Sequence, residues 1–352
     1  MSEEKIGIVA ANNIRYSPYI LFYTNILDEC GASYELIYPN RNQIDEAWDG
    51  IAYPLEWNNR IHSILNYMLY TDKVIRIIKE KKYSKLIILT SVIAAYMANW
   101  LEKHYQGRFV VDIRDYTYEN IKLYAYLEGK ALRTAKYRVI SSERFKCFLP
   151  QLEYHIAHNI SVSKDYCSVK WEKHDIPIII GYVGSVAYKR TIEALARLVK
   201  KDSRFCFYIY GGGPVQEEVK KIVTECACER VRYYGPYEPK DKPEIIGSID
   251  ILFNVYGNDS PLLLYALSNK LYDAMYYHKL VLNSIGTYME EMCGICGYSI
   301  DLEKNGALKE LYNWYKGIDE YQINEYQDRM SARFFKENSI THDAIVKFIR
   351  EV

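Results

Sequence analysis

The sequence predicts an α/β fold made of two doubly wound, Rossmann-like domains. Buried strands alternate with amphipathic helices twice along the chain, first over residues 5–160 and again from residue 178. This alternation is typical of parallel sheets with helices packed on both faces. Residues 161–177 are polar and lack periodicity, so we interpret them as a linker. With 352 residues, the chain is long enough for each domain to bury a core of its own.

Composition argues against several classes of protein. Lysine and arginine together number 45, as do aspartate and glutamate, so the formal net charge is zero and no overall field attracts nucleic acid. No run of 18 apolar residues is present, and the first five residues are too polar for a signal peptide, which predicts a cytoplasmic protein. The eight cysteines lack the spacing of a zinc site, and disulfides are not expected in a reducing compartment.

The first domain begins with a strand, helix, strand order, which implies parallel pairing through a right-handed crossover. Strands are expected at residues 5–11, 34–38, 85–89 and 109–113, and helices at residues 18–30, 60–80 and 91–104. Residues 39–60 show no clear period, so no element is predicted there. Ligands of such sheets bind beyond the carboxyl ends of the strands.

The second domain repeats the alternation. Strands are expected at residues 178–183, 205–210, 231–234 and 249–253, and helices from residue 190, at 215–226 and at 242–247. The three glycines at 211–213 follow a strand, but Pro214 comes next and the spacing is not that of a dinucleotide-binding fingerprint. We interpret these glycines as allowing the close approach of a ribose or a base. From residue 307 onward the chain is expected to be helical.

Two helix starts carry cations where the helix dipole is already positive. Lys270 stands in the first turn of a helix that leads into a strand near Leu280, and Asp273 lies off the buried face of that helix. The buried face is predicted to consist of Leu271, Ala274, Met275 and His278. Lys189 and Arg190 likewise open a helix after a turn at residues 184–185. A cation at a helix N-terminus is unfavourable unless an anion is near, so two such termini could cradle a diphosphate. The alternative for each is an ordinary solvated surface.

Five segments of the second domain then point to a family. They are GYVGS with its following basic pair (181–190), YGGGP (210–214), YYGPY (233–237), SIDILF (248–253) and NKLYDAMYYHKLV (269–281). In this order and spacing they resemble the nucleotide-sugar domain of retaining GT-B glycosyltransferases, specifically family 4. The resemblance covers roughly residues 178–300 and is weak before residue 105. It implies an acceptor domain at 1–165, a donor domain at 178–334 facing it across a cleft, and a C-terminal helix at about 335–352 that returns to the first domain.

The resemblance also implies roles for individual residues. Lys189 and Arg190 would stabilise the departing diphosphate as catalytic cations, so that no metal and no other cofactor is expected. Asp273 would hold the ribose hydroxyls, and Tyr237 would lie near the base. The remaining donor-binding residues would be Gly184, Ser185, Gly212, Ser268, Asn269 and Lys270, of which the last three would reach the distal phosphate through their amides.

Two departures from the family pattern concern the donor. The usual pair of glutamates eight positions apart appears here as Tyr265 and Asp273, so the first acid is missing and the second is one methylene shorter. The glycine-rich loop after the first strand is also absent, because residues 10–13 read AANN. Neither change alters the predicted fold.

The acceptor side is predicted at the end of the strand at 109–113. Asp112, Arg114 and Asp115 lie there, on the edge that faces the acceptor in the resembling family. Asp115 would orient or help to deprotonate the attacking hydroxyl, and Asp112 and Arg114 would bind the acceptor, with Arg114 suited to an acidic or phosphate group. The alternative is structural, with one aspartate capping the following helix and the other paired with Arg114.

The segment from Lys122 to Lys146 is basic. It has seven basic and two acidic residues, an excess of five, with leucines and tyrosines between them. Such a segment could lie on an anionic membrane surface, on the inner face of the cell membrane. A solvated helix face is the alternative.

Together these features predict a glycosyltransferase that moves a sugar from a nucleotide-diphosphate donor to a saccharide or lipid-linked saccharide acceptor. The resemblance implies retention of configuration and a place in bacterial surface polysaccharide synthesis. Two alternatives stay open: a sugar-nucleotide epimerase of the same architecture, and a non-catalytic subunit. The second would be expected to have lost the basic pair at 189–190, which is present.

Overall fold

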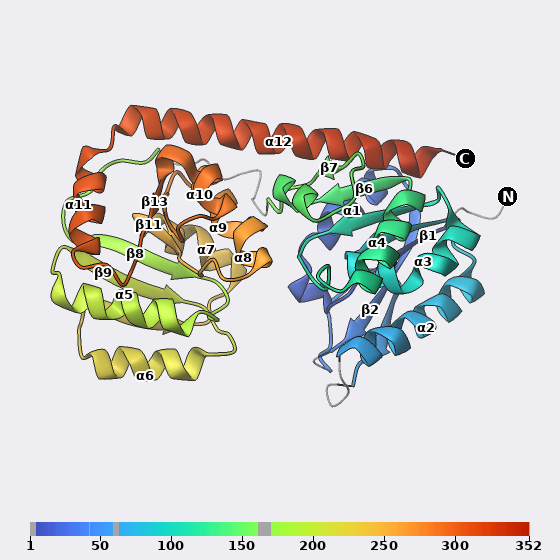
Figure 1. Cartoon of the computed structure of the whole chain (residues 1–352), viewed down its shortest axis with the longest axis horizontal. Helices are drawn as coiled ribbons and strands as arrows, with labels where there is room; N and C mark the ends of the chain where they lie inside the picture. Colours follow the sequence, from blue (N-terminus) through green and yellow to red (C-terminus); the bar gives the residue numbers. More distant parts are fainter. Residues whose placement is uncertain (1–4, 42, 59–62, 161–169, 352) are drawn as a thin grey trace. The chain divides into compact units, whose positions relative to one another are not determined.

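The structure, a computed structural model, describes residues 5–41, 43–58, 63–160 and 170–351 (Figure 1). The chain divides into two compact units: unit 1 is Met1–Ser161 with Phe335–Val352, and unit 2 is Val162–Phe334. Each unit contains one parallel sheet with helices, so the predicted α/β fold with two Rossmann-like sheets is confirmed. Of the predicted linker, residues 161–169 lie outside the described residues.

Unit 1 has a seven-stranded sheet in the order β3-β2-β1-β4-β5-β6-β7. Its strands are β1 (Lys5–Val9), β2 (Ser33–Asn40), β3 (Ala52–Glu56), β4 (Lys85–Leu89), β5 (Phe109–Ile113), β6 (Tyr137–Ile140) and β7 (His155–Ile156). Its helices are α1 (Ile20–Glu29), α2 (Ser63–Lys81), α3 (Ser91–Tyr105) and α4 (Lys122–Thr134), with 3-10 turns at Ile14–Tyr16 and Glu143–Cys147. The strands β1, β4 and β5 are almost entirely buried because helices cover both faces of the sheet.

Alternate side chains of these strands face two different helix layers. One face packs in a single cluster against α1 and the end of α12 (Glu320–Arg350), with Tyr23, Leu27, Ile345 and Phe348 all buried there. Lys85 fixes the end of α12, because its ammonium donates to the carbonyl of Ile349 at 2.9 Å. The helix α12 therefore begins in unit 2 and completes the core of unit 1.

The strand β3 was not predicted. It lies at the edge of the sheet and pairs in parallel with β2. Its side chains are only partly buried or exposed, and Pro54 removes a backbone donor, as edge strands tolerate. The sequence therefore carries neither the apolar run of a buried strand nor a clean alternation, which explains why residues 39–60 show no period.

Unit 2 has a six-stranded sheet in the order β10-β9-β8-β11-β12-β13. Its strands are β8 (Ile178–Val183), β9 (Phe205–Tyr210), β10 (Val231–Gly235), β11 (Ile251–Asn254), β12 (Leu280–Asn283) and β13 (Gly297–Ser299). Its helices are α5 (Lys189–Lys201), α6 (Gln216–Cys226), α7 (Lys242–Gly247), α8 (Pro261–Tyr265), α9 (Asn269–Tyr276), α10 (Tyr288–Cys293) and α11 (Ala307–Gly317), with 3-10 turns at Pro239–Asp241 and Gly294–Cys296. The helix α5 buries Ile192, Leu195, Ala196 and Val199, which confirms the predicted apolar stripe.

No helix in the described part of the chain is long and apolar enough to span a bilayer.

Unit 1 also contains a buried acid whose ionisation should set the pH dependence of stability. Burial raises the pKa of Glu128 to about 8, and the neighbouring Glu119 carboxylate adds to the rise. The folded protein thus retains a proton that the unfolded chain loses near pH 4.5. The stabilisation is complete below that pH and is lost as the pH rises toward 8.

We expect the free energy of unfolding to fall by on the order of 2–4 kcal/mol between pH 5 and 8, since one unit of pKa shift corresponds to about 1.4 kcal/mol. Glu128→Gln should remove this decline, because the amide stays neutral at every pH. Glu80→Gln, at an exposed position of α2, is the matched control and should leave the decline intact. Melting curves at several pH values would measure both. A Glu128→Gln profile that follows the wild type throughout would show that Glu128 ionises normally.

Candidate functional site

The site is built on three turns at the carboxyl ends of β8, β9 and β10. Gly184, Gly211 and Gly235 have φ values of 126°, 134° and 84°. The turns bond to one another through the backbone, from Gly184 N to Tyr210 O at 2.9 Å and from Gly211 N to Gly235 O at 2.7 Å. A Cβ on Gly211 would lie 1.8 Å from the carbonyl oxygen of Gly184. The positions of these turns are therefore fixed by direct backbone contact.

This packing corrects the interpretation of the glycines at 211–213. A Cβ on Gly213 would lie 2.4 Å from Val186 O, so Gly211 and Gly213 leave room for the neighbouring turn and not for a ligand. Gly212 differs, because the nearest atoms to a Cβ there are side-chain atoms of Gln216 and Pro236 at 3.1 and 3.2 Å. Among the three, Gly212 is the one that faces side chains and not the backbone of a neighbouring turn.

The helix α9 brings Lys270 to the first of these turns. Ser268 caps the helix, and its hydroxyl accepts from the amide of Lys270 at 3.2 Å. The ammonium of Lys270 lies over the rings of Tyr182 and Tyr256, 5.7 and 5.5 Å from their centroids. A Cβ on Gly184 would lie 3.0 Å from that ammonium nitrogen. No carboxylate in the described ranges forms an ion pair with Lys270.

Asp273 occupies a different position from the one predicted. The sequence placed it off the buried face of its helix, but it is only 7% exposed. Its Oδ1 accepts from the ammonium of Lys242 at 2.6 Å, and Lys242 is the first residue of α7. The start of α7 therefore supplies the charge that allows this carboxylate to be buried.

Tyr237 lies close to the same carboxylate. Burial raises the pKa of Tyr237 to about 12, and the negative charge of Asp273 contributes to the rise. Lys242 was missed from the sequence, although it repeats the pattern of a cation in the first turn of a helix that drew attention to Lys189 and Lys270. The pattern of Asp273, Lys242 and Tyr237 brings a carboxylate, a cation and a phenol together beyond the end of β10.

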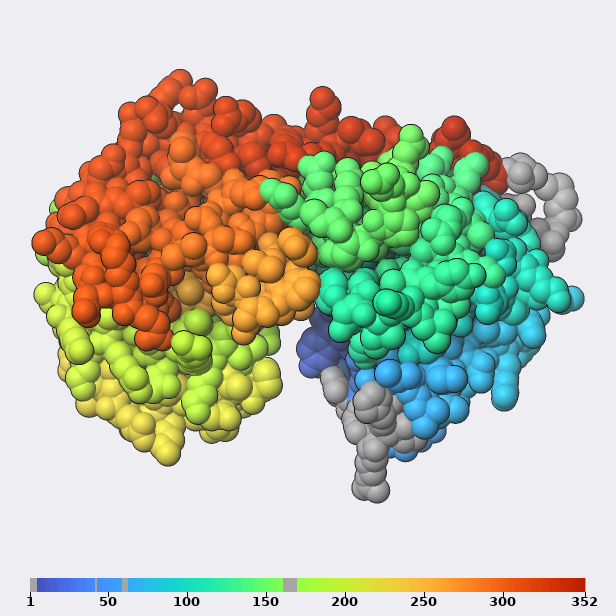
Figure 2. Space-filling model, viewed as in Figure 1, coloured from blue at the N-terminus to red at the C-terminus, as the bar shows by residue number. Residues whose placement is uncertain are grey.

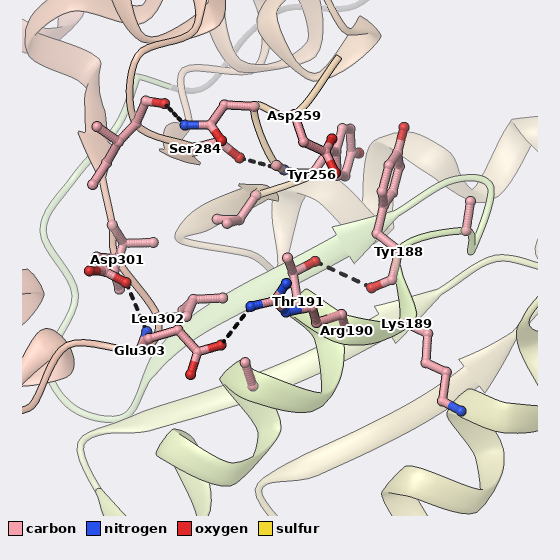
Figure 3. A pocket seen from close by; sticks show the side chains of 17 residues that line it. Tyr188, Lys189, Arg190, Thr191, Tyr256, Asp259, Ser284, Asp301, Leu302 and Glu303 are labelled. Atoms are coloured by element: carbon pink, nitrogen blue, oxygen red, sulfur yellow. Dashed lines mark hydrogen bonds and ion pairs between the residues drawn. The ribbon is translucent and has the colours of Figure 1, made fainter. Parts of the chain in front are cut away.

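The two cations at the start of α5, Lys189 and Arg190, are exposed to solvent. Figure 3 shows the side chain of Lys189 extending away from the other side chains drawn there. Arg190 Nη2 lies 3.4 Å from Glu303 Oε1, and the two side chains are 87% and 72% exposed. This is a solvent-exposed ion pair, which contributes little stability and is easily exchanged for another partner.

Arg190 lines a pocket of about 650 Å³ at the carboxyl ends of β11, β12 and β13 (Figure 3). Tyr188 and Tyr256 stack in its wall with ring centroids 4.0 Å apart and an angle of 9° between the planes. Asp259 and Asp301 line the pocket as well. An apolar wall with carboxylates and a guanidinium around it could accept a polyhydroxylated ring.

The predicted acceptor residues in unit 1 separate into two kinds. Asp112 is fully buried, and its Oδ2 accepts from the Tyr23 hydroxyl and from Arg114 Nη2, both at 2.6 Å. Arg114 also donates to Ala157 O at 2.8 Å. Asp112 and Arg114 thus form the ion pair that the structural alternative predicts. Asp115 is exposed just beyond the end of β5.

Comparison by sequence identifies no relative: no family model and no curated protein matches the chain. Comparison by structure is informative. The lipopolysaccharide outer core galactosyltransferase WaaB matches with a TM-score of 0.62 and 16% identity, covering 96% of this chain and 99% of WaaB. Anabaena HepE in complex with UDP and glucose matches with a TM-score of 0.66 and 14% identity, covering 97% of this chain and 98% of HepE.

A protein described as a UDP-N-acetylglucosamine 2-epimerase, from Listeria monocytogenes, matches as well. Its TM-score is 0.61 at 11% identity, and the match covers 97% of this chain and 95% of the epimerase. Transferases and an epimerase thus have the same architecture, and the likeness extends over the whole chain in each case. Two parallel Rossmann-like sheets in these orders, matched along nearly all their length to such structures, show that this chain has the GT-B fold.

Proposed function

We propose that the protein is a glycosyltransferase that moves a sugar from a nucleoside-diphosphate donor, held by unit 2, to a saccharide or lipid-linked saccharide acceptor. One observation carries the proposal: the Gly184 turn and the start of α9 converge on the unpaired ammonium of Lys270. Backbone donors and a cation so arranged suit a diphosphate. UDP is the first nucleotide to consider, because the similar HepE was solved with UDP and glucose.

The following contacts with the donor are proposed. Asp273 would bind the ribose hydroxyls, with Lys242 holding the carboxylate in position. Tyr237 and Gly212 would lie near the base, and the amide of Ser185 would bind the phosphates. At the start of α9 the amides of Ser268 and Lys270 already donate to Met289 Sδ and Ser268 Oγ, so the ammonium of Lys270 is the group of that segment proposed to reach the distal phosphate. The charge of the departing diphosphate calls for a cation at one of the two helix starts, for which Lys189, Arg190 and Lys270 are the candidates.

On the acceptor side, the exposed carboxylate of Asp115 is the proposed group that orients the attacking hydroxyl. Asp112 and Arg114 would act indirectly, by holding the end of β5 in place through their mutual ion pair. Retention of configuration is proposed by analogy with the resembling family. A role in bacterial surface polysaccharide synthesis is supported by the names of WaaB and of WaaG, a glycosyltransferase involved in lipopolysaccharide biosynthesis.

Contact with a membrane surface is proposed for unit 1. The proposal now rests on exposed apolar side chains more than on the basic excess of residues 122–146. Lys130 pairs with Glu102 and Lys136 with Glu351, each at 2.7 Å, so acids from elsewhere in unit 1 offset part of the basic excess. Exposed apolar side chains are present instead. They lie in the first turns of two helices, Leu65, Met68 and Leu69 in α2 and Leu123 and Tyr126 in α4.

The Ser63 and Tyr118 hydroxyls, 3.1 Å apart, join the start of α2 to the segment before α4. The surfaces of α2, α3 and α4 adjoin on the face of unit 1 seen in Figure 2. The exposed apolar side chains of α2 and α4, here called the apolar patch, would suit the interface of a bilayer.

The proposed function is tested by incubating the protein with nucleoside diphosphates and their sugars. A bound ligand at a hundred times its dissociation constant raises stability by about 2.7 kcal/mol, which a thermal-shift panel detects. We expect one nucleotide, tested first as UDP and UDP-glucose, to stabilise the protein. Conversion of the donor sugar to an epimer in the absence of any acceptor would establish the epimerase instead. No stabilisation by any nucleoside diphosphate would overturn a donor site in unit 2.

Asp273→Asn tests the ribose assignment. A carboxylate accepts from both ribose hydroxyls, whereas the amide offers one acceptor and no charge. We expect kcat/KM for the donor to fall by roughly 10- to 150-fold, equivalent to about 1.5–3 kcal/mol for hydrogen bonds to a charged group. Acceptor affinity should be unchanged. Because the substitution also leaves Lys242 unpaired, stability should be measured alongside by thermal melting.

A donor with a 2′- or 3′-deoxyribose separates the two effects. The deoxy donor should be penalised with the wild type and not further penalised with Asp273→Asn, since the contact it lacks is already gone. Two outcomes would show that Asp273 serves only as the structural partner of Lys242. One is a loss of stability with unchanged donor kinetics, and the other is an equal loss of kcat/KM with the deoxy donor in both proteins.

Membrane contact is tested by sedimentation with lipid vesicles. The wild type should sediment with anionic vesicles more than with neutral ones, and less at high salt. Met68→Glu combined with Leu123→Glu should lower the bound fraction several-fold, because it places charge in the apolar patch. Tyr321→Glu is the control, since Tyr321 is 76% exposed but lies in unit 2. Equal recovery of the wild type and the double variant would remove the patch from consideration.

A further inference from the structure

Given the donor site proposed for unit 2, we infer that Lys270, and not Lys189 or Arg190, supplies the positive charge that stabilises the departing diphosphate. The inference deepens the proposed function by assigning the leaving-group cation to a helix other than α5. In the resembling family this duty belongs to the basic residues that follow the first turn of the donor domain. In this chain the geometry points to a lysine from α9.

The ammonium of Lys270 lies where a bound diphosphate would be. The ammonium of Lys270 lies against the Gly184 turn, so close that a Cβ at Gly184 would stand 3.0 Å from it. The same residue contributes the amide that Ser268 caps at the start of α9. One residue therefore presents an ammonium beside the turn of β8 and forms part of the start of α9. An anion that bound both backbone segments would have this ammonium beside it.

Two tyrosine rings fix the orientation of the Lys270 ammonium. Tyr182 and Tyr256 hold the ammonium over their faces through cation–π contacts. Tyr256 is itself fixed by its stack on Tyr188. The rings orient the cation without neutralising it, unlike a carboxylate partner. The charge is thus aimed before any ligand arrives, which is the condition for stabilising charge that develops in a transition state.

The electrostatics around Lys270 favour an anionic ligand. Lys270 stands in the first turn of α9, where the helix dipole disfavours a cation. No carboxylate among the described residues compensates it. A bound diphosphate would relieve this cost.

The cations of α5 lack each of these features. Lys189 extends away from the neighbouring side chains, and Arg190 is already paired with Glu303 at the surface (Figure 3). Both are exposed, so their charges act through water and are screened by salt. They could attract the donor at a distance. They do not have the fixed, shielded position of Lys270.

Transfer of the sugar requires a cation beside the departing diphosphate. The bond between the anomeric carbon and the diphosphate oxygen breaks, and its electron pair stays on that oxygen. The acceptor hydroxyl forms the new bond to the same carbon and releases its proton to water. Negative charge therefore builds on the diphosphate as the sugar leaves, and an adjacent ammonium lowers the energy of that state more than that of the bound donor.

The test compares Lys270→Met with Lys189→Met and Arg190→Met, all in the full chain. Titration calorimetry would measure the binding of uridine, UMP and UDP, with ADP and GDP as the next probes if the wild type does not bind UDP. Lys270→Met should weaken UDP binding at least tenfold and leave uridine binding unchanged. It should also lower kcat roughly 100-fold, the typical effect of losing one charge-stabilising group. The two α5 variants should stay within about threefold of the wild type in UDP binding.

Lys270→Arg and Lys270→Gln guard against misfolding. Both keep a long polar side chain, and Lys270→Arg should recover more of the UDP affinity than Lys270→Gln because it retains the charge. Unchanged UDP binding and kcat in Lys270→Met, or a larger loss in Arg190→Met, would overturn the assignment while leaving the donor site in place. A wild type that binds none of UDP, ADP and GDP would overturn the proposed function itself, and with it this inference.

Discussion

The donor side of this molecule depends on the direct backbone contact between the turns that end β8, β9 and β10. Gly211 and Gly184 approach so closely that no side chain fits between them, and a Cβ on Gly213 would in turn lie 2.4 Å from Val186 O. Hydrogen bonds and close backbone packing consequently hold the Gly184 turn against the turn that ends β9. Everything placed against that turn inherits its rigidity, including the ammonium of Lys270 and the start of α9. A site whose donors are fixed in advance needs little reorganisation when charge develops.

Much of the fold follows from local patterns in the sequence. The stripe of Ile192, Leu195, Ala196 and Val199 gives α5 at helical spacing, and β-branched runs give β4, β5 and β8. The edge strand β3 escapes such reasoning, because a strand that is half exposed and contains Pro54 has no periodic signal. Its existence is decided by pairing with β2, which is a tertiary event.

The site is less predictable than the fold for the same reason. The sequence shows which helix starts bear cations, but it does not show which way their side chains extend. Arg190 turns to Glu303, more than a hundred residues away, and Asp273 is buried because Lys242 of α7 reaches it. Both outcomes depend on residues distant in the chain. The glycines at 211–213 show why the sequence does not identify a binding residue by itself. A residue without a side chain can make room for a ligand or for another turn, and the sequence is the same in both cases.

The continuity of α12 has a consequence for the order in which the molecule can be made. Ile345 and Phe348 belong to the same core cluster as Ile8 and Val110, and the ammonium of Lys85 holds the carbonyl of Ile349. A ribosome that adds about 5–20 residues per second reaches these positions roughly 10–40 s after it has passed the end of β7. During that interval the nascent first unit exposes the apolar face that α12 later covers. Chaperone binding at this stage of synthesis is therefore to be expected on the face of the sheet that carries α1.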